Sequence, residues 1–469
     1  MKLTLSEIAG ICQGLLYNSL GTEIVFGVTI DSRQVKPGDL YVPIKGEKFD
    51  GHQFIAAAGK NGAVAAFCEQ QQADLVQDLN LPVIIVESAL QAMQELAAWY
   101  LKQTKARVVA ITGSVGKTST KDMVAAVLQT KFKVLANKGN LNTEIGLPLT
   151  LFALKPEVDY AVLEMGMRGP GQITELTEIA PPFIGVLINV GESHIELLGS
   201  QEAIATAKGE LLAALPAQGW AILNGDDPLV RSQSSRSAAP LIYYGFSSQA
   251  DLQVTATDLE QLSDGRVRFM LKIGSEQTPV TLAAPGQHNV KNALAAAAVG
   301  YSLGLTGSEI AFGLSQVDLT PMRCQVLETP RGYRIIDDTY NACYDSMRAG
   351  LDLLASLKEE GNRSIAVLGD MLELGDNCIP AHRRVGQYVV ESGVDYLITV
   401  GTRSRQIANG AVSNGLLTDH VRSVPDTDSA VEVLRSLVQA TDVILVKGSR
   451  SMQMEKVVAA MVGESSNEY

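Results

Sequence analysis

The chain of 469 residues is longer than one hydrophobic core normally serves, so we expect two or three domains. Its composition, with 46% hydrophobic and 19% charged residues, is typical of a folded globular protein and excludes a disordered chain. The formal net charge of −13 argues against nucleic-acid or anionic-membrane partners, which need clustered Lys and Arg. An anionic substrate stays compatible with this charge where basic residues converge locally.

The cysteines and the apolar segments indicate the compartment. The five cysteines contain no CxxC pair and are odd in number, so we expect reduced, structural thiols. The N-terminal segment lacks the apolar stretch of a signal peptide, and the longest apolar run, near residues 293–305, is too short to span a bilayer. We therefore expect a cytoplasmic protein without a membrane-inserted segment.

The first 87 residues predict a small α/β domain. Short apolar segments alternate with turn signals and with amphipathic, helix-length segments. The predicted strands cover residues 24–30, 39–44, 63–67 and 82–86.

The most informative segment is the glycine turn TGSVGKTST over residues 112–120. A helix from residue 89 precedes it, an apolar strand over 107–111 enters it, and a helical pattern from 117 to about 130 leaves it. Backbone N–H groups and the helix dipole then point at the same anion, which predicts a phosphate site rather than a plain turn. The loop is shorter than the standard form, because Ile111 stands where that form has its first glycine.

Each residue of this loop has a predicted role. Lys117 is expected on the outer phosphates of a nucleotide and the Thr118 hydroxyl on Mg²⁺. The predicted nucleotide contacts of the loop are Gly113, Ser114, Val115, Gly116, Lys117, Thr118 and Ser119.

The rest of the chain predicts two further α/β domains. Strands over 160–165 and 184–190 alternate with helices, which indicates a doubly wound parallel sheet with ligands at the carboxyl ends of its strands. An Asp264-Gly265 turn predicts an antiparallel hairpin near 251–284. The pattern restarts near residue 320, with strands over 334–337, 364–368, 396–400 and 442–446. The expected domains cover residues 1–87, 88–320 and 321–469.

Three polar residues near strand ends or in a helix are candidates for catalysis. Glu164 ends a buried strand, where a carboxylate is costly unless it serves an ion, so a Mg²⁺ ligand is favoured over a helix cap. His194 lies just past the next strand and is either a metal or phosphate contact or a structural histidine. Taken alone, Lys208 is typical of a solvated surface lysine on a helix.

Other polar residues leave alternatives open. His288, Asn289 and Asn292 begin an Ala-rich helix, and the two amides could either read a purine edge or cap the helix. Asp338, after a strand, could hold a ribose hydroxyl or be a turn acid. Further strand-end residues of the third domain, which face whatever it binds, are Asp370, Lys447 and Arg450.

Taken together, these segments resemble the Mur ligase family, the ATP-dependent amide-forming enzymes of peptidoglycan precursor synthesis. The resemblance covers residues 25–459. The segments that carry it are TIDSRQVKPGDLYVPIKGEKFDGH, TGSVGKTSTK, NKGNLNTEIGLP, EMGMRGPGQI, NVGESHIELLGS, AKGE, GQHNVKNALAA, DDTYNACYDSM, LGDMLELG and VKGSRSMQME. It implies an N-terminal UDP-muramoyl-binding domain, a central P-loop domain with a mainly parallel sheet, and a C-terminal Rossmann-like domain that binds nucleotide and an incoming dipeptide.

The resemblance also implies the reaction. The segments DDTYNA, LGDMLELG and KGSR are similar to those of the Mur ligase that acts last in precursor synthesis. That ligase adds D-alanyl-D-alanine to UDP-N-acetylmuramoyl-tripeptide through an acyl phosphate. The tripeptide's third residue, lysine or diaminopimelate, is not specified, and a monomer is expected. A ligase that adds a single amino acid to a dipeptide precursor or to folate, a P-loop phosphotransferase and a non-catalytic nucleotide-binding regulator remain alternatives.

By the same likeness, individual residues acquire roles. Lys117, Glu164, His194 and Lys208 are the implied catalytic residues, with Thr118, Glu164, His194 and a CO₂-derived carbamate on Lys208 around two Mg²⁺ ions. Asn289 and Asn292 are expected near adenine, Arg323 near the γ-phosphate and Asp338 on the ribose. The implied substrate contacts are Asp31, Ser32 and Arg33 for UDP, Asn140 and Asn142 for the muramoyl part, and Tyr340 and Asn341. Cys343 and Tyr344 replace the family's usual Asn-Pro, so this loop's contacts stay open.

Overall fold

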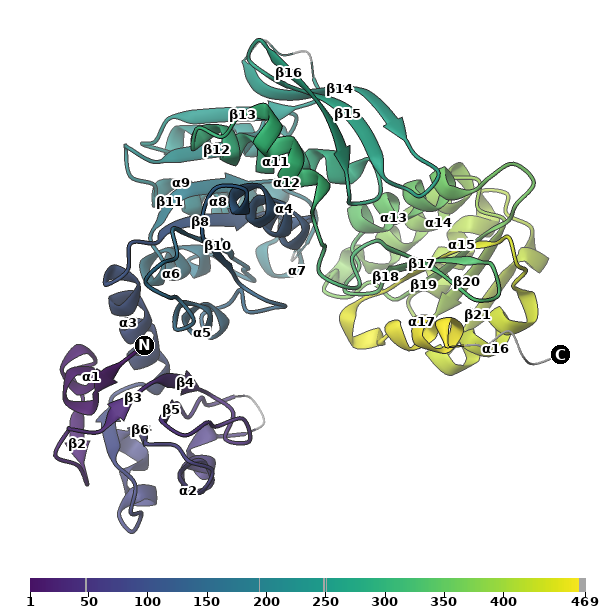
Figure 1. Cartoon of the computed structure of the whole chain (residues 1–469). Coiled ribbons are helices and arrows are strands. Elements are labelled where there is room, and N and C mark those ends of the chain that lie inside the picture. The colour runs from purple at the N-terminus through teal and green to yellow at the C-terminus, as the bar shows by residue number, and fades with distance from the viewer. Residues whose placement is uncertain (47–48, 194, 248, 250, 464–469) are drawn as a thin grey trace. The chain divides into compact units, whose positions relative to one another are not determined.

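The computed structural model describes residues 1–46, 49–193, 195–247, 249 and 251–463, and the chain divides into two compact units (Figure 1). The first unit comprises Met1–Ala110, Phe132–Met167 and Gly171–Phe183. The second comprises Ile111–Lys131, Arg168–Pro170 and Ile184–Tyr469.

The N-terminal part of the first unit contains a five-stranded sheet with the order β2-β7-β6-β5-β4. Its strands are β2 (Leu15–Tyr17), β4 (Gly27–Thr29), β5 (Asp39–Tyr41), β6 (Ala65–Glu69) and β7 (Val83–Val86), all parallel except β2. A separate pair joins β1 (Leu3–Thr4) to β3 (Ile24–Val25). The single strand predicted over 24–30 is therefore two strands in different sheets, because the backbone N–H of Phe26 bonds to Gly38 instead of continuing the first pair.

The helices of the first unit lie between these strands and after them in the chain. They are α1 (Leu5–Ile11), α2 (Ile55–Lys60), α3 (Ala89–Lys102), α5 (Gly146–Leu151) and α6 (Gln172–Ile179), with 3₁₀ turns η1 (Gly51–Phe54) and η2 (Gln70–Val76). The helix expected from residue 89 is confirmed as α3, whose N-cap Ser88 accepts a hydrogen bond from Gln91 N.

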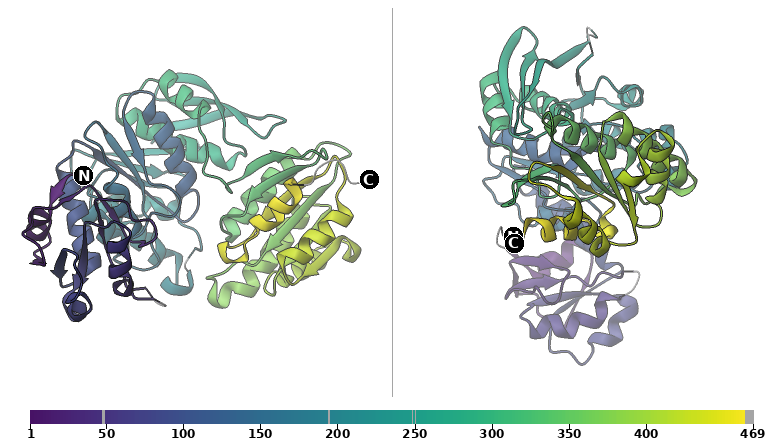
Figure 2. Two further views of the ribbon diagram at one scale, coloured as in Figure 1. Left: turned by 60° about the horizontal axis from the view of Figure 1, so that its bottom comes forward. Right: turned by 90° about the vertical axis from the view of Figure 1, so that its right-hand side faces the viewer.

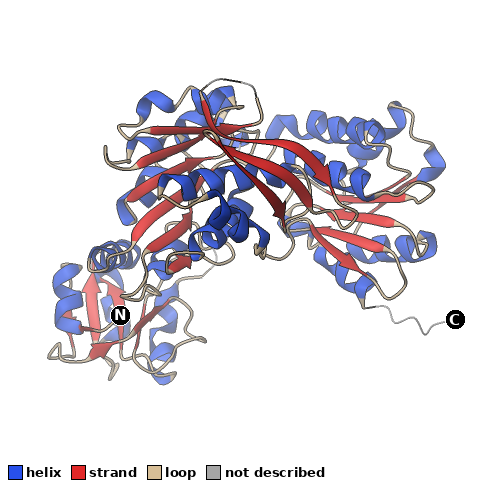
Figure 3. Cartoon of the chain, turned by 45° about the horizontal axis from the view of Figure 1, so that its top comes forward, coloured by secondary structure: helices blue, strands red, loops and turns tan. Residues whose placement is uncertain are grey.

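A nine-stranded sheet has the order β16-β15-β14-β13-β12-β11-β8-β10-β9 (Figure 3). Its strands in chain order are β8 (Arg107–Thr112), β9 (Val134–Ala136), β10 (Tyr160–Glu164), β11 (Pro182–Leu187), β12 (Trp220–Asn224), β13 (Leu241–Gly245), β14 (Leu252–Gln261), β15 (Val267–Ile273) and β16 (Glu276–Leu282). Strands β11 to β14 pair in parallel and β14 to β16 antiparallel. The predicted hairpin near 251–284 is therefore confirmed, with a third strand.

Helices of the second unit follow the strand ends of this sheet. They are α4 (Lys117–Gln129), α7 (Ile195–Leu198), α8 (Gln201–Lys208), α9 (Glu210–Ala213), α10 (Pro228–Arg231), α11 (His288–Ser302) and α12 (Gly307–Ser315), with the 3₁₀ turn η3 (Ser234–Arg236). Helix α11 buries its alanines completely, which lets it lie close to its neighbours.

The C-terminal part of the second unit is a doubly wound α/β layer structure (Figure 2). Its six-stranded sheet has the order β17-β18-β22-β19-β20-β21, and only β17 is antiparallel. The strands are β17 (Gln325–Glu328), β18 (Arg334–Asp338), β19 (Ser364–Gly369), β20 (Tyr396–Val400), β21 (Val421–Val424) and β22 (Val443–Lys447). The helices are α13 (Tyr344–Leu357), α14 (Cys378–Glu391), α15 (Arg405–Ser413), α16 (Thr427–Leu437) and α17 (Glu455–Val462), with 3₁₀ turns η4 (Gly375–Asn377), η5 (Thr418–His420) and η6 (Arg450–Met452).

Burial on both faces explains why these strands read as continuous apolar runs. Neighbouring side chains on a strand point to opposite faces, so Ile336 packs with α13 to α15 and Ile335 packs with α16 and α17. The predicted α/β class with mainly parallel sheets is confirmed.

Glycines let helices α14 and α15 pack unusually closely. A Cβ on Gly386 would lie 2.1 Å from the Ile407 carbonyl oxygen and 2.6 Å from Ala411 N, and a Cβ on Gly410 would lie 2.4 Å from the Arg383 carbonyl oxygen. The obstructing atoms belong to backbone, so a side chain there would push the two helices apart.

We therefore expect Gly386→Ala to lower the free energy of unfolding by about 3 kcal/mol, measured by urea unfolding. Gly10→Ala is the matched control, because Gly10 is also helical and its Cβ would meet nothing within 4 Å. That control should raise stability by about 0.5 to 1 kcal/mol. Equal stability of Gly386→Ala and the wild type would contradict the packing argument.

Candidate active site

The phosphate loop lies between β8 and α4, as predicted. Gly116, the N-cap of α4, has φ +86°, and a Cβ there would lie 2.7 Å from Asn292 Oδ1. Both facts require glycine at this position. Because α4 begins at the next residue, its first N–H groups open toward the loop and form a ready anion site.

Asn189, two residues after β11, holds the loop in shape. Its Oδ1 accepts hydrogen bonds from Ser114 N at 3.0 Å and Val115 N at 2.9 Å, and its Nδ2 donates to the Val115 carbonyl at 2.8 Å. Gly191 N donates to Ser114 Oγ at 2.8 Å. Asn189 was not among the predicted site residues, although it shares with Glu164 a place at the end of a strand.

Lys117 and Lys208 converge on one carbonyl group. The Nζ atoms of both residues donate to the Gly113 oxygen at 3.0 Å. Lys208 is only 2% exposed, and burial together with the positive charge of Lys117 lowers its pKa well below the ordinary value. Lys208 is therefore a buried amine at the phosphate loop rather than a solvated surface lysine, and its surroundings disfavour the charged form.

Arg323 also reaches the phosphate loop. Its NH2 donates to Thr118 Oγ1 at 3.1 Å, and its guanidinium carbon lies 3.9 Å from the ring centre of Tyr340. Within the described part of the chain, the buried Nε of Arg323 has no hydrogen-bond partner. A buried unsatisfied donor on a cation suits an anionic ligand such as phosphate.

The side-chain amides of Asn289 and Asn292 form hydrogen bonds within the protein. Asn292 Nδ2 donates to Asn289 Oδ1 at 2.9 Å, and its Oδ1 accepts from Thr120 at 3.2 Å. Asn289 in turn donates to the Pro285 carbonyl at 2.7 Å. This series of hydrogen bonds holds Asn292 beside Gly116 and so supports the phosphate loop.

In the first unit, Glu164 lies at the end of β10 and is only 3% exposed. Asn142 Nδ2 donates to its Oε1 at 2.7 Å, and the backbone N–H of Glu164 bonds to Asn137 Oδ1 at 2.9 Å. The amide of Asn142, expected on the muramoyl substrate, thus orients this carboxylate, while Asn140 accepts from Asn142 N through its carbonyl. His194, the other expected metal ligand, lies outside the described residues.

Asp338 at the end of β18 pairs with Lys447 at the end of β22, at 2.5 Å. Lys447 Nζ also donates to the Asn341 carbonyl at 2.9 Å and is 1% exposed. Two other strand-end residues make local contacts, since Asp370 accepts from Ser404 N at 2.7 Å and Arg450 pairs with Glu455 at 2.9 Å.

In the first unit, Asp31, Ser32 and Arg33 form a local turn after β4. Asp31 accepts three hydrogen bonds from Arg33 and one from Gln34, which lower its pKa to about 2. The Ser32 carbonyl accepts from Asn61 at 2.8 Å. Arg33 extends into solvent, with its side chain 86% exposed, and can reach a ligand.

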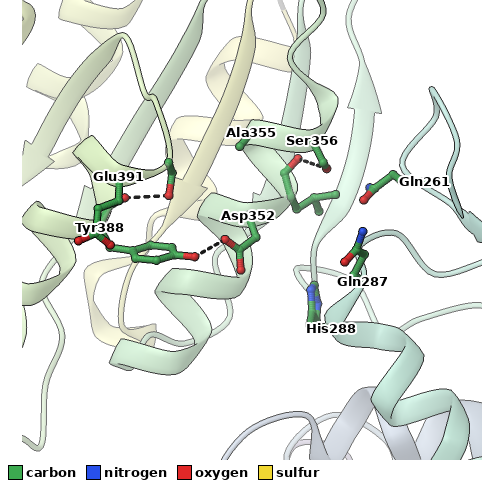
Figure 4. Close-up of a pocket in the computed structure, with 10 residues that line it drawn as sticks. Gln261, Gln287, His288, Asp352, Ala355, Ser356, Tyr388 and Glu391 are labelled. Atoms are coloured by element: carbon green, nitrogen blue, oxygen red, sulfur yellow. Dashed lines mark hydrogen bonds between the residues drawn. The ribbon is translucent and has the colours of Figure 1, made fainter. Parts of the chain in front are cut away.

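A cavity of about 660 Å³ adjoins the start of α11. Figure 4 shows Tyr388 hydrogen-bonded to Asp352 on one side and Gln261, Gln287 and His288 on the other. His288 is partly buried, which lowers its pKa, and its Nε2 lies 3.7 Å from Cys324 Sγ. The cavity walls therefore offer hydrogen-bonding groups together with the carboxylates of Asp352 and Glu391.

Two searches of the described residues gave negative results. No cluster of three or more His, Cys, Asp or Glu side chains could hold a metal ion there. No described helix is both long and apolar enough to cross a bilayer.

Comparison with protein families covers most of the chain. Residues 25–100 match the catalytic domain of the Mur ligase family, residues 111–300 the Mur ligase middle domain, and residues 322–450 the Mur ligase glutamate ligase domain.

Individual relatives match the sequence of this chain over nearly their full length. The UDP-N-acetylmuramoyl-tripeptide–D-alanyl-D-alanine ligase of Bacillus subtilis is 37% identical and covers 98% of this chain and 99% of its own. The Escherichia coli ligase of the same name is also 37% identical, with 98% of each chain covered.

Solved structures agree in fold. A MurF crystal structure from Acinetobacter baumannii superposes with a TM-score of 0.90 at 29% identity over 99% of both chains. MurF of Thermotoga maritima in complex with ADP has a TM-score of 0.81 at 29% identity, covering 93% of this chain and 96% of that one. From the matched domains and these full-length relatives, we conclude that the chain belongs to the Mur ligase family.

Proposed function

We propose that the chain is an ATP-dependent ligase of peptidoglycan synthesis, which joins D-alanyl-D-alanine to the terminal carboxylate of UDP-N-acetylmuramoyl-tripeptide. The observation that carries this proposal is the convergence of Lys117 and Lys208 on the Gly113 carbonyl of the phosphate loop. It occurs in a chain that matches ligases of this activity over 98% of its length.

The chemistry follows from the poor reactivity of a carboxylate. The tripeptide carboxylate attacks the γ-phosphate of ATP, forming an acyl phosphate and ADP. Lys117 and Arg323 are cations at the phosphate loop and stabilise the charge spread over the transferring group. The dipeptide amine then attacks the acyl carbon, and phosphate leaves.

The expected domains and ligand contacts belong to the same proposal. Residues 1–87 would bind the UDP-muramoyl substrate through Asp31, Ser32 and Arg33, 88–320 would bind ATP, and 321–469 would bind nucleotide and dipeptide. The further proposed contacts are Asn289 and Asn292 for adenine, Asp338 for ribose, Asn140 and Asn142 for the muramoyl part, and Tyr340 and Asn341 for substrate. We also infer a cytoplasmic location, because ATP and a nucleotide-linked substrate are its reactants, and the expected monomer belongs to the same proposal.

Magnesium fits the donors that this chain offers. Thr118 supplies a hydroxyl, and Glu164 a buried carboxylate already oriented by Asn142, and hard oxygen donors are those that Mg²⁺ prefers. His194 would complete the set. When bound, the ions would neutralise charge on the transferred phosphoryl group.

Carbamylation of Lys208 fits its surroundings. The nitrogen of a neutral lysine can attack CO₂ and lose a proton, giving an anionic carbamate with two oxygen donors. The lowered pKa of Lys208 favours its neutral amine, whereas an ammonium would repel Mg²⁺. The carbamate would therefore place a negative charge beside Lys117.

Lys208→Ala should abolish nearly all activity, and added short-chain carboxylic acids should restore part of it by replacing the carbamate oxygens. The assay is steady-state ADP release, with a ¹³C NMR signal from labelled bicarbonate as a second readout. Lys102→Ala is the matched control, an exposed lysine also in the last turn of a helix. Full activity of Lys208→Ala would remove the carbamate from the proposal.

Asn189→Ala should raise the KM for ATP about 10- to 100-fold, because it removes three hydrogen bonds that fix the loop backbone. The KM for D-alanyl-D-alanine should change little. Asn224→Ala serves as control, since Asn224 also donates from the end of a neighbouring strand, to Ile188, but does not touch the loop. Equal effects of the two variants on the KM for ATP would mean that Asn189 acts only through general stability.

The overall reaction is tested with defined substrates. ADP release should require both UDP-N-acetylmuramoyl-tripeptide and D-alanyl-D-alanine, and single amino acids should not replace the dipeptide. With ¹⁸O in the tripeptide carboxylate, one labelled oxygen should appear in inorganic phosphate. Release of unlabelled phosphate, or phosphate transfer to a stable acceptor, would rule out the acyl phosphate.

A further inference from the structure

A charged cluster at the start of α13 lies beside the phosphate loop and has no part in the nucleotide contacts above. The carboxylate of Asp345 lies against Gly191, where a Cβ would stand 2.5 Å from Asp345 Oδ2 and 3.4 Å from Ser114 Cβ. Gly191 is itself hydrogen-bonded to Ser114. Asp345 is exposed to solvent, so a ligand can reach this carboxylate next to the loop.

Arg348 lies one helical turn further along α13 and is also exposed. Its guanidinium carbon is 4.6 Å from the ring centre of Tyr388 and 5.8 Å from that of Tyr344. In the part of the chain that the structure describes, Arg348 forms no ion pair with a carboxylate, and the nearby Asp352 accepts a hydrogen bond from Tyr388. The aromatic rings thus orient a cation whose charge is available to an anionic ligand.

Arg384 differs from Arg348 because its guanidinium group already pairs with a carboxylate of the protein. It pairs with Glu192 at 3.0 Å, and its guanidinium carbon lies 3.8 Å from the ring centre of Tyr344. Tyr344, which departs from the usual family sequence, therefore has Arg384 on its ring and Arg348 nearby. This tyrosine therefore lies against both arginines of the cluster.

The two available charges match a zwitterionic dipeptide. Asp345 and Arg348 are three residues apart on one helix, so they share a face and are separated by a rise of about 4.5 Å. The ammonium and carboxylate of an extended dipeptide are at most about 7 Å apart, which flexible side chains on that face can span. The negative group lies nearest the phosphate loop, where the amine must react.

We propose that Asp345 and Arg348 form the acceptor site for the dipeptide of the proposed ligase reaction, on which this inference rests. Asp345 binds the ammonium group and takes one of its protons, and Arg348 binds the terminal carboxylate. The cluster thereby selects a substrate with both charges and points its amine at the acyl phosphate.

The proton balance is simple. One N–H proton of the ammonium moves to the Asp345 carboxylate, which leaves a neutral amine. Its nitrogen forms a bond to the acyl carbon, the bond from that carbon to the phosphate oxygen breaks, and phosphate leaves with the electron pair. The second proton lost from nitrogen and the proton on Asp345 pass to solvent.

The surroundings of Asp345 favour this proton transfer. Partial desolvation, and then the negative charge of Glu192, raise its pKa, and Asp227 adds to the rise while Arg348 and Arg384 oppose it. A carboxylate with a raised pKa is a better proton acceptor from an ammonium group.

The carboxylate contact is tested by comparing D-alanyl-D-alanine with its C-terminal amide. Arg348→Gln should raise the KM for the dipeptide about 10- to 100-fold, leaving the KM for the amide and for ATP unchanged, and Arg348→Lys should recover part of the loss. Arg383→Gln, an exposed arginine of α14 bonded to Gln406, should behave as wild type. Equal losses for dipeptide and amide would overturn the assignment of Arg348.

The proton transfer is tested with Asp345→Asn. Its kcat/KM for the dipeptide should fall, and the deficit should shrink as pH rises toward the amine pKa of about 8, because the free amine then needs no base. Asp428→Asn is the control, since Asp428 is also an exposed acid in the first turn of a helix. A deficit that does not change with pH, or no deficit, would overturn the role of Asp345.

These outcomes are separable from the proposed function itself. The wild-type protein must release ADP with tripeptide and D-alanyl-D-alanine, and its failure to do so would overturn both proposals. Exchange of ¹⁸O within ATP, in the presence of the tripeptide alone, reports acyl-phosphate formation and should persist in both variants. An active wild type whose variants keep wild-type acceptor kinetics would overturn only the acceptor site.

Discussion

The carbonyl group of Gly113 is the point on which the chemistry of the second unit depends. It accepts hydrogen bonds from Lys117, four residues further along the chain, and from Lys208, which is 95 residues away from Gly113. The oxygen can face both only because Asn189 fixes the next two backbone N–H groups in one orientation. A loop free to rotate these peptides would lose the convergence of the two amines.

This geometry has an electrostatic consequence. Two Nζ atoms that each lie 3.0 Å from one oxygen cannot be more than about 6 Å apart. Two full charges at that separation would repel by about 3 kcal/mol at an effective dielectric constant near 20. Because Lys208 is the buried one, the repulsion and the burial both lower its pKa, so the charged form is disfavoured at Lys208.

Strand-end reasoning from the sequence found part of the site and missed part of it. It selected Glu164 and Asp338, which the structure places at the ends of β10 and β18. It passed over Asn189, because an amide after a strand carries no charge to mark it. Asp345 and Arg348 were also missed, since a charged pair on a helix looks like an ordinary solvated face until the neighbouring loop is known. The strands that were not predicted are β1, β2, β9, β12, β13, β17 and β21.

The sequence by itself determined the α/β class, the position of the phosphate loop and the resemblance that leads to the family. These are local properties, because strand length, glycine spacing and helix onset are set by neighbouring residues. Only the tertiary structure decided that Lys208 is buried against Gly113, that Asn142 orients Glu164, and that Arg348 lies beside the rings of Tyr388 and Tyr344. Burial and partners depend on segments distant in the chain, and the free energy of a charge depends on exactly those surroundings.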